Sequence, residues 1–193
     1  LSFPYEIMRA THMKHHAFTN QPDKDFDYDV KDSKNIGEVA LKVCDGAQKY
    51  DAMMENFAND KAFIKAFQKG SIAASILGLT QLILVILFPL QTLFLWWIPR
   101  KIGTFYTSVF FSWYPHYQLD VGRYKDTRFW SHWMPRYINH SMQLHFIHHL
   151  HPSIGHFDEP KAIELLKPFL IARGVPGAEK IPEKVTYNPM INI

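Results

Sequence analysis

The chain contains a single cysteine, Cys44, among its 193 residues. No disulfide can form within it, and zinc or iron–sulfur sites built from cysteine are excluded. We expect Cys44 to be a buried or interfacial structural thiol. The chain also lacks a basic stripe, because its formal net charge is only +3 and its lysines and arginines are scattered. Nucleic acid is therefore not an expected partner.

Charge is absent from two long stretches in the middle of the chain. Residues 71–99 contain no Asp, Glu, Lys or Arg, and a second uncharged run covers residues 102–119. Since about 20 apolar helical residues cross a bilayer, the region predicts two membrane crossings. It is not a signal peptide, because it lies in mid-chain with no small-residue cleavage site behind it.

Histidine is missing from residues 71–114 but forms a cluster on each side of them. Both clusters have the spacing i, i+3, i+4: His12, His15 and His16 near the start, and His145, His148 and His149 near the end. On a helix this spacing puts three imidazoles on one face. Imidazole binds Zn, Cu, Fe or Ni, and six histidines exceed the four ligands of a structural zinc site. The pattern favours two metal ions.

The second cluster is predicted to lie on a helix that ends near Leu150. Pro152 disfavours helical geometry in His151, and His151 would fall on the opposite side of such a helix from His145. We therefore leave His151 out of the ligand set. Structural or surface roles are assigned to the remaining histidines outside the clusters: His132, His140, His151 and His156.

A helical hairpin is expected between the clusters, because two clusters that serve one site must lie on the same side of the bilayer. Its turn has two possible places. A turn between Pro89 and Gln91 leaves two basic residues inside the second span, which is costly unless they snorkel or face protein. A turn between Pro99 and Lys101 puts those charges in water, close to tryptophans that suit the interface. We favour the second turn.

The segment before the hairpin is predicted to contain two helices and a loop. Residues 1–18 read as a helix, and residues 59–70 have the period of an amphipathic helix that lies at the membrane interface or packs on a core. The loop of residues 19–30 carries alternating aspartates: Asp23, Asp25, Asp27 and Asp29. A calcium loop is disfavoured, because Val30 stands where that motif needs glycine.

After the hairpin, a polar loop precedes the second cluster and a helix follows it. The loop carries four charged residues that read as solvated, or as contacts for an electron donor or anionic headgroups: Arg123, Lys125, Asp126 and Arg128. The helix is expected within residues 157–174, with Asp158 as its cap and Gly174 past its end. Residues 175–193 are expected to form an extended tail.

Two stretches carry a resemblance to a known family. HMKHHAFTNQPDKDFD and QLHFIHHLHPSIGHFDEPKA resemble the second and third histidine boxes of the membrane fatty acid desaturase superfamily, which includes carotenoid hydroxylases and ketolases. The similarity covers nearly the whole chain. It implies an all-α fold, an integral-membrane helical hairpin with a cytoplasmic helical cap that carries the histidine boxes. We expect residues 1–70, 71–115 and 116–193 to be the three portions of one such domain.

The resemblance also implies a chemistry. Members use two non-haem iron ions and O2 to attack a C–H bond of a lipid, with electrons from a donor such as ferredoxin or cytochrome b5 with its reductase. The histidines that match the family's ligands are His12, His15, His16, His116, His145, His148 and His149. Three aspartates would orient ligating imidazoles, or else form a solvated acidic turn: Asp23, Asp25 and Asp27. The boxes would face the cytoplasm.

Alternatives remain for the substrate and for catalysis itself. A carotenoid such as β-carotene could replace the acyl chain, since hydroxylation and desaturation begin with the same hydrogen abstraction. A non-catalytic metal-binding membrane protein is the alternative of another class, although metal transport predicts histidines along the membrane path. The family's first histidine box has no counterpart upstream of His12. We therefore expect a fragment of an active enzyme, which by itself binds iron poorly.

Overall fold

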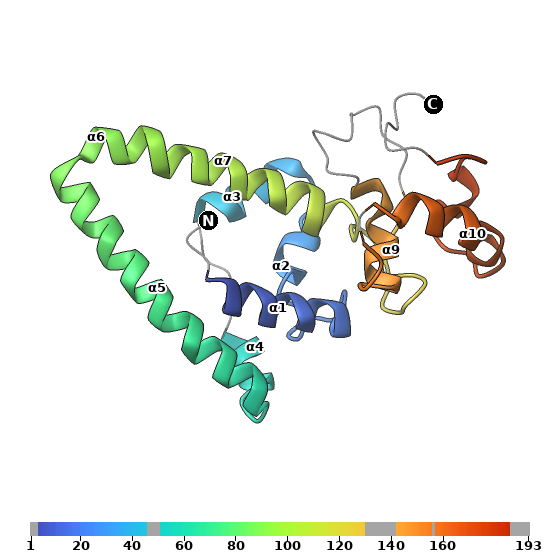
Figure 1. The fold of residues 1–193 in the computed structure, drawn as a ribbon, viewed down its shortest axis with the longest axis horizontal. Coiled ribbons are helices and arrows are strands. Elements are labelled where there is room, and N and C mark those ends of the chain that lie inside the picture. The colour runs from blue at the N-terminus through green and yellow to red at the C-terminus, as the bar shows by residue number, and fades with distance from the viewer. Residues whose placement is uncertain (1–3, 46–50, 130–141, 156, 186–193) are drawn as a thin grey trace. The chain divides into compact units, whose positions relative to one another are not determined.

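Helices make up all the regular secondary structure of the residues that the computed structural model describes, which are 4–45, 51–129, 142–155 and 157–185 (Figure 1). The predicted all-α fold is confirmed. The chain forms two compact units, Leu1–Val109 and Phe110–Ile193. The first unit contains the apolar helices, and the second contains the later histidine cluster.

The first histidine cluster lies on α1 (Tyr5–Phe18), which packs against α5 (Lys61–Leu87). Ile7 of α1 is buried at this contact and faces Gly70 of α5. A Cβ atom at position 70 would lie only 2.3 Å from Cγ1 of Ile7. Glycine therefore lets the two helices approach closely, and α1 packs against the N-terminal part of α5.

An aromatic core and an ion pair join α1 to the start of α5. The core contains Phe26, Phe57 and Phe63, and the Nζ atom of Lys14 lies 4.4 Å from the ring centroid of Phe57. Nζ also lies 2.5 Å from a carboxylate oxygen of Asp60. That carboxylate accepts hydrogen bonds from the first backbone N–H groups of α5, so one side chain caps α5 and holds α1.

Three short helices connect α1 to α5: α2 (Tyr28–Lys31), α3 (Ile36–Asp45) and α4 (Asp51–Asn56). Val39 and Val43 of α3 are buried. Cys44, near the end of α3, is exposed. The expectation of a buried thiol is wrong, because the valines fill the inward face of this helix, and an interfacial role stays a prediction.

Helix α5 is the one helix in the described part of the chain that is long and apolar enough to cross a membrane. Its first turns follow the amphipathic pattern predicted for residues 59–70, with Phe63 in the aromatic core and Lys61 and Lys65 exposed. Beyond Gly70 its side chains are largely exposed, and only 6% of its most apolar stretch is buried. This exposure argues against the core helix of a water-soluble protein.

The chain reverses direction between α5 and α6 (Pro89–Thr92), at Phe88 (Figure 1). Pro89 restricts the residue before it to non-helical geometry, and Phe88 has φ −139° and ψ 62°. The favoured turn between Pro99 and Lys101 is therefore wrong. Both residues lie inside α7 (Ile98–Thr107).

The returning arm stays helical from α6 to α7 through a π-helical turn, η1 (Leu93–Trp97). Pro99 follows directly in the first turn of α7. A wider π turn accommodates a proline that cannot donate its backbone hydrogen bond, so Pro99 does not reverse the chain. A second π-helical stretch, η2 (Ser108–Trp113), follows α7. The crossing of a membrane by this arm stays a prediction.

Lys101 explains how the returning arm tolerates charge. Its Nζ atom donates hydrogen bonds to the backbone carbonyls of Val43 (2.8 Å) and Cys44 (3.2 Å) at the end of α3. A cation is favourable at a helix C-terminus. The lysine thus faces protein, which answers the objection to a turn near Pro89 for one of the two basic residues.

The second unit is built around its own apolar core. Its elements are η3 (Met142–Leu144), α9 (His145–Leu150), α10 (Glu159–Ala172) and η4 (Ala178–Lys180). Phe146 and Ile147 of α9 and Ile163 of α10 are fully buried in this core. The predicted end of α9 at Leu150 and the helix within residues 157–174 are confirmed.

The ends of α10 and the segment after it differ in part from expectation. Gly174 follows the helix with φ +63°, as predicted for a residue past a helix end. Asp158 precedes the helix but its side chain makes no capping bond. The extended tail is wrong for its first part, because Val175, Ala178 and Ile181 belong to the buried core. Residues 186–193 lie outside the described residues.

Candidate metal centre

The three histidines of α1 lie on one face of the helix, as their spacing predicts. His15 is buried, with 1% of its surface exposed, whereas His16 is half-buried and His12 is exposed. The Nε2 atoms of His12 and His16 lie 3.0 Å apart. The two residues are one helical turn apart, and their ring nitrogens are directed to a common position.

A carboxylate behind His15 fixes the orientation of its ring. Nδ1 of His15 lies 2.7 Å from Oδ1 of Asp25, and both side chains are 1% exposed. A carboxylate is an acceptor, so Nδ1 carries the proton and Nε2 is left with its lone pair. This is the outer-sphere arrangement of metal-binding histidines, in which the carboxylate sets the tautomer and raises the basicity of the ligand.

The loop after α1 is shaped to hold that carboxylate. The hydroxyl of Thr19 donates to the carbonyl of His15 (2.7 Å), the backbone of Thr19 leaves helical geometry with ψ 131°, and Asn20 follows with φ +65°. The backbone N–H groups of Asn20 and Asp27 donate to the two oxygens of Asp25 at 2.8 and 2.9 Å. Burial raises the pKa of Asp25, but the hydrogen bonds from His15 and the backbone outweigh burial and lower that pKa overall.

The other aspartates of this loop lie farther from the imidazole. An oxygen of Asp27 is 3.9 Å from Nδ1 of His15. Asp23 contributes a backbone carbonyl, which accepts a hydrogen bond from Nδ2 of Asn56. Asp25 therefore makes the direct hydrogen bond to a histidine ring that the sequence suggested for this loop.

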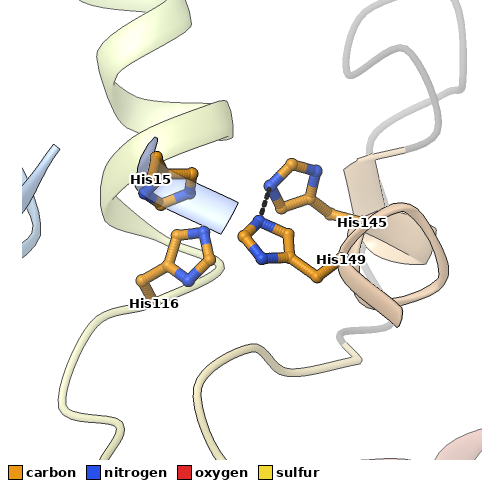
Figure 2. A group of neighbouring side chains, drawn as sticks. All are labelled: His15, His116, His145 and His149. Carbon is orange, nitrogen blue, oxygen red and sulfur yellow. Dashed lines mark hydrogen bonds between the residues drawn. The ribbon is translucent and has the colours of Figure 1, made fainter. Parts of the chain in front are cut away.

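The second unit brings three histidines together by itself. Figure 2 shows the rings of His116, His145 and His149 directed toward one another. Each offers a ring nitrogen within 4.8 Å of the other two, and Nε2 of His145 lies 3.1 Å from Nε2 of His149. His116 is 0% and His145 is 3% exposed. Two of these residues come from α9, and His116 joins them from the chain that follows η2.

A main-chain carbonyl orients His116. Its Nδ1 atom lies 2.7 Å from the backbone oxygen of Asp126 and 3.5 Å from the hydroxyl of Thr127. The hydroxyl of Thr127 donates to the carboxylate of Asp126, which keeps the loop in place. Sequence reasoning missed this role, because any residue supplies a backbone carbonyl and no residue type marks it.

The remaining histidines occupy other positions. The half-buried ring of His148 stacks on His145, with ring centroids 5.5 Å apart. His151 ends α9 and is exposed. The predicted roles of His132, His140 and His156 concern residues outside those that the structure describes.

The chemistry of both groups fits a metal ion. Two nitrogens bound at about 2.1 Å to one ion, at right angles, lie about 3.0 Å apart. The two i, i+4 pairs show separations of 3.0 and 3.1 Å. His15 and His116 each have Nδ1 engaged with an oxygen, which makes the buried Nε2 atom of each ring the nitrogen that can bind a metal ion. Imidazole donors of this kind suit Fe, Zn, Cu or Ni.

The comparisons with known proteins agree with this chemistry. A family model described as fatty acid desaturase matches residues 1–177, which include both histidine groups and α5. No curated protein and no solved structure matches the chain. The family comprises membrane-associated oxidoreductases of the desaturase and hydroxylase type. By the extent of this match, the chain belongs to the fatty acid desaturase family.

Proposed function

We propose that the protein is a membrane-bound non-haem di-iron oxidoreductase that uses O2 to desaturate or hydroxylate a lipid acyl chain. The observation that carries the proposal is the pair of buried, outer-sphere-bonded imidazoles, His15 and His116, each within a histidine group. Family membership supports the same chemistry, because fatty acid desaturases typically hold two irons.

The proposal unites the two histidine groups in one centre at the cytoplasmic face of the membrane. Residues that would hold the irons are His12, His15, His16, His116, His145, His148 and His149. The hairpin of α5 and the returning arm would cross the membrane twice and return the chain to the same side. The exposed apolar side chains of α5 support this placement.

Bound iron would supply the activation of O2 that no side chain can provide. The protein's own residues do the rest: Asp25 and the carbonyl of Asp126 hold protons on the Nδ1 atoms of His15 and His116, and burial excludes water. For desaturation, an acyl CH2–CH2 unit loses two hydrogens while O2 is reduced to two waters. Two electrons from ferredoxin or cytochrome b5 with its reductase, together with two protons, complete the balance.

Metal binding tests whether the groups form one centre. We expect the purified chain, loaded anaerobically with excess Fe²⁺, to bind iron weakly, with an occupancy that depends on both His15 and His145. If the two groups share one centre, His15→Ala should also weaken iron binding by the second group, and His145→Ala should also weaken iron binding by the first. If each variant loses only its own group's iron, and the losses add in the double variant, the shared centre is contradicted.

Product analysis tests the reaction. We expect hosts that express the protein to accumulate acyl chains with a new double bond or hydroxyl group. Variants His15→Ala and His145→Ala, produced at equal levels, should accumulate none. Oxygenated carotenoids in a host that makes β-carotene would identify the carotenoid hydroxylase or ketolase instead. No new product in either host would contradict catalysis and favour a non-catalytic metal-binding protein.

A further inference from the structure

Arg128 is a half-buried cation whose charge is not balanced by any described carboxylate. Its backbone N–H donates to the carbonyl of Pro115 (3.1 Å), and its guanidinium carbon lies 6.0 Å from the ring centroid of Tyr114. Its Nε atom is buried and makes no hydrogen bond with the described residues. Partial burial of a cation that has no carboxylate partner costs free energy, so an anion bound at this position would be favourable.

Within the described part of the chain, no acidic side chain takes this role. Burial lowers the pKa of Arg128, and the groups that act on its charge are the tyrosines Tyr114 and Tyr117. Among the described residues no ion pair involves it.

Other arginines of the second unit are satisfied differently. Nη2 of Arg123 donates to the carbonyl of Leu150 at the end of α9. Arg173 also lies over a tyrosine, with its guanidinium carbon 5.4 Å from the ring centroid of Tyr124, but its Nη1 donates to the carbonyl of Phe169. Arg173 is exposed. An arginine over a tyrosine is therefore not unusual here, whereas the buried Nε of Arg128 is.

We propose that Arg128, flanked by Tyr114 and Tyr117, binds the anionic head group, a phosphate or a carboxylate, of an amphiphilic substrate. The inference rests on the proposed function. A guanidinium matches both anions with two parallel hydrogen bonds, and the rings of Trp113 and Tyr117, 4.9 Å apart, offer an apolar surface beside it. The sequence leaves three roles open for this charged loop: a solvated surface, contact with an electron donor, or contact with anionic headgroups. The proposal gives Arg128 a head-group role, toward the substrate.

The proposed head-group site lies close to His116 along the chain. Tyr114 and Tyr117 flank His116 in sequence, and Arg128 lies two residues after Asp126, whose carbonyl orients the His116 ring. A head group held at Arg128 would therefore fix one end of the substrate on the same loop that positions a metal-binding histidine. Substrates with a neutral head would lack this anchor.

The test measures binding rather than catalysis. The full chain, purified in a neutral detergent without metal, is titrated with dodecyl phosphate, dodecanoate, dodecanol and inorganic phosphate, and affinities are obtained by calorimetry. We expect both anionic amphiphiles to bind and Arg128→Gln to weaken them about tenfold to a hundredfold. Arg128→Lys should retain part of the affinity, and Arg173→Gln, the matched control, should retain all of it.

The outcomes separate the sources of the anion. Binding of dodecyl phosphate but not inorganic phosphate supports an amphiphile head group, whereas equal binding of inorganic phosphate overturns the amphiphile assignment in favour of a free-anion site. Equal affinity of Arg128→Gln and the parent chain for every probe, or dodecanol binding as tightly as dodecanoate, overturns the proposal. Because no iron or turnover is involved, failure here leaves the oxidoreductase proposal standing, and a failed product analysis leaves this result interpretable.

Discussion

Different hydrogen-bond acceptors orient the imidazole rings in the two histidine groups. In the first, a buried carboxylate, that of Asp25, accepts the Nδ1 proton of His15. In the second, a backbone carbonyl, that of Asp126, accepts the corresponding proton of His116. A carboxylate adds negative charge and makes the imidazole a stronger donor, while a carbonyl mainly fixes the ring. A side-chain substitution can remove the acceptor of His15 and so change how strongly that imidazole binds a metal. The acceptor of His116 is a backbone atom, which a side-chain substitution leaves in place.

The groups also differ in what supports them. Helix α1 is held on α5 by the contact of Ile7 with Gly70 and by the Lys14–Asp60 ion pair. Helix α9 is embedded in an apolar core of its own unit. The position of the first group therefore depends on the apolar helix α5. The position of the second group depends on the apolar core around α9. Each prediction below changes one side of this comparison.

The largest effect is expected from removing a ligand of the second group. His145→Ala takes away one nitrogen of a close pair, and His145→Gln does so while keeping most of the volume. We expect the affinity for Co²⁺, read from its visible absorption, to fall at least about 100-fold in both, since even outer-sphere partners are worth about 10–100-fold. His151→Ala, which alters an exposed residue beyond α9, should leave affinity unchanged. Equal affinities in all three variants would contradict the ligand role.

The next effect concerns the support of the first group. Gly70→Ala would place a Cβ atom 2.3 Å from Cγ1 of Ile7, whereas Gly78 of the same helix has open space around it. We expect Gly70→Ala to destabilise the chain by about 1–3 kcal/mol, the usual cost of overpacking. Gly78→Ala should cause no loss. Hydrogen exchange should rise in α1 but not in α9, and a uniform rise in both would contradict the separate supports.

A carboxylate and a carbonyl respond differently to amide substitution. Asp25→Asn removes the negative charge behind His15, so Co²⁺ affinity of the first group should fall about 10–100-fold. Asp126→Asn leaves the backbone carbonyl in place, and the second group should keep its affinity. The two variants are compared by the same absorption titration. A loss for Asp126→Asn as large as that for Asp25→Asn would contradict the distinction between the acceptors.

Sequence reasoning reached the features that periodicity encodes. The helical spacing of the histidines predicted their shared faces, and Pro152 predicted the end of α9. The match to residues 1–177 confirmed the family that the histidine boxes suggested. These features depend on residue type and spacing within a few turns, which a single sequence contains.

Sequence reasoning failed where a distant contact decides the outcome. The turn near Pro89 is disfavoured by the sequence because it leaves Arg100 and Lys101 in the apolar arm. For Lys101, α3 supplies backbone carbonyls from more than fifty residues away. The acceptor for His116 is a backbone atom, which has no sequence pattern. The core position of Ile181 depends on packing against α9 and α10, and composition alone suggested a loose tail.

The smallest effect is expected from acid, acting on the ion pair beneath the first group. The hydrogen bond from Lys14 and the backbone N–H groups of Phe63 and Ala62 lower the pKa of Asp60. A carboxyl whose pKa is lowered by folding adds stability that is present at neutral pH and is lost as the pH falls through the folded-state pKa. The unfolding free energy of the parent chain should therefore decrease below about pH 4. Asp60→Asn keeps a capping oxygen but cannot titrate, so its denaturant-unfolding free energy should fall less steeply over that range. Glu183→Gln, at the exposed ion pair with Lys167 in the second unit, should leave the acid dependence of hydrogen exchange in α1 unchanged. An identical acid profile for Asp60→Asn and the parent would remove this pair from the support of the first group.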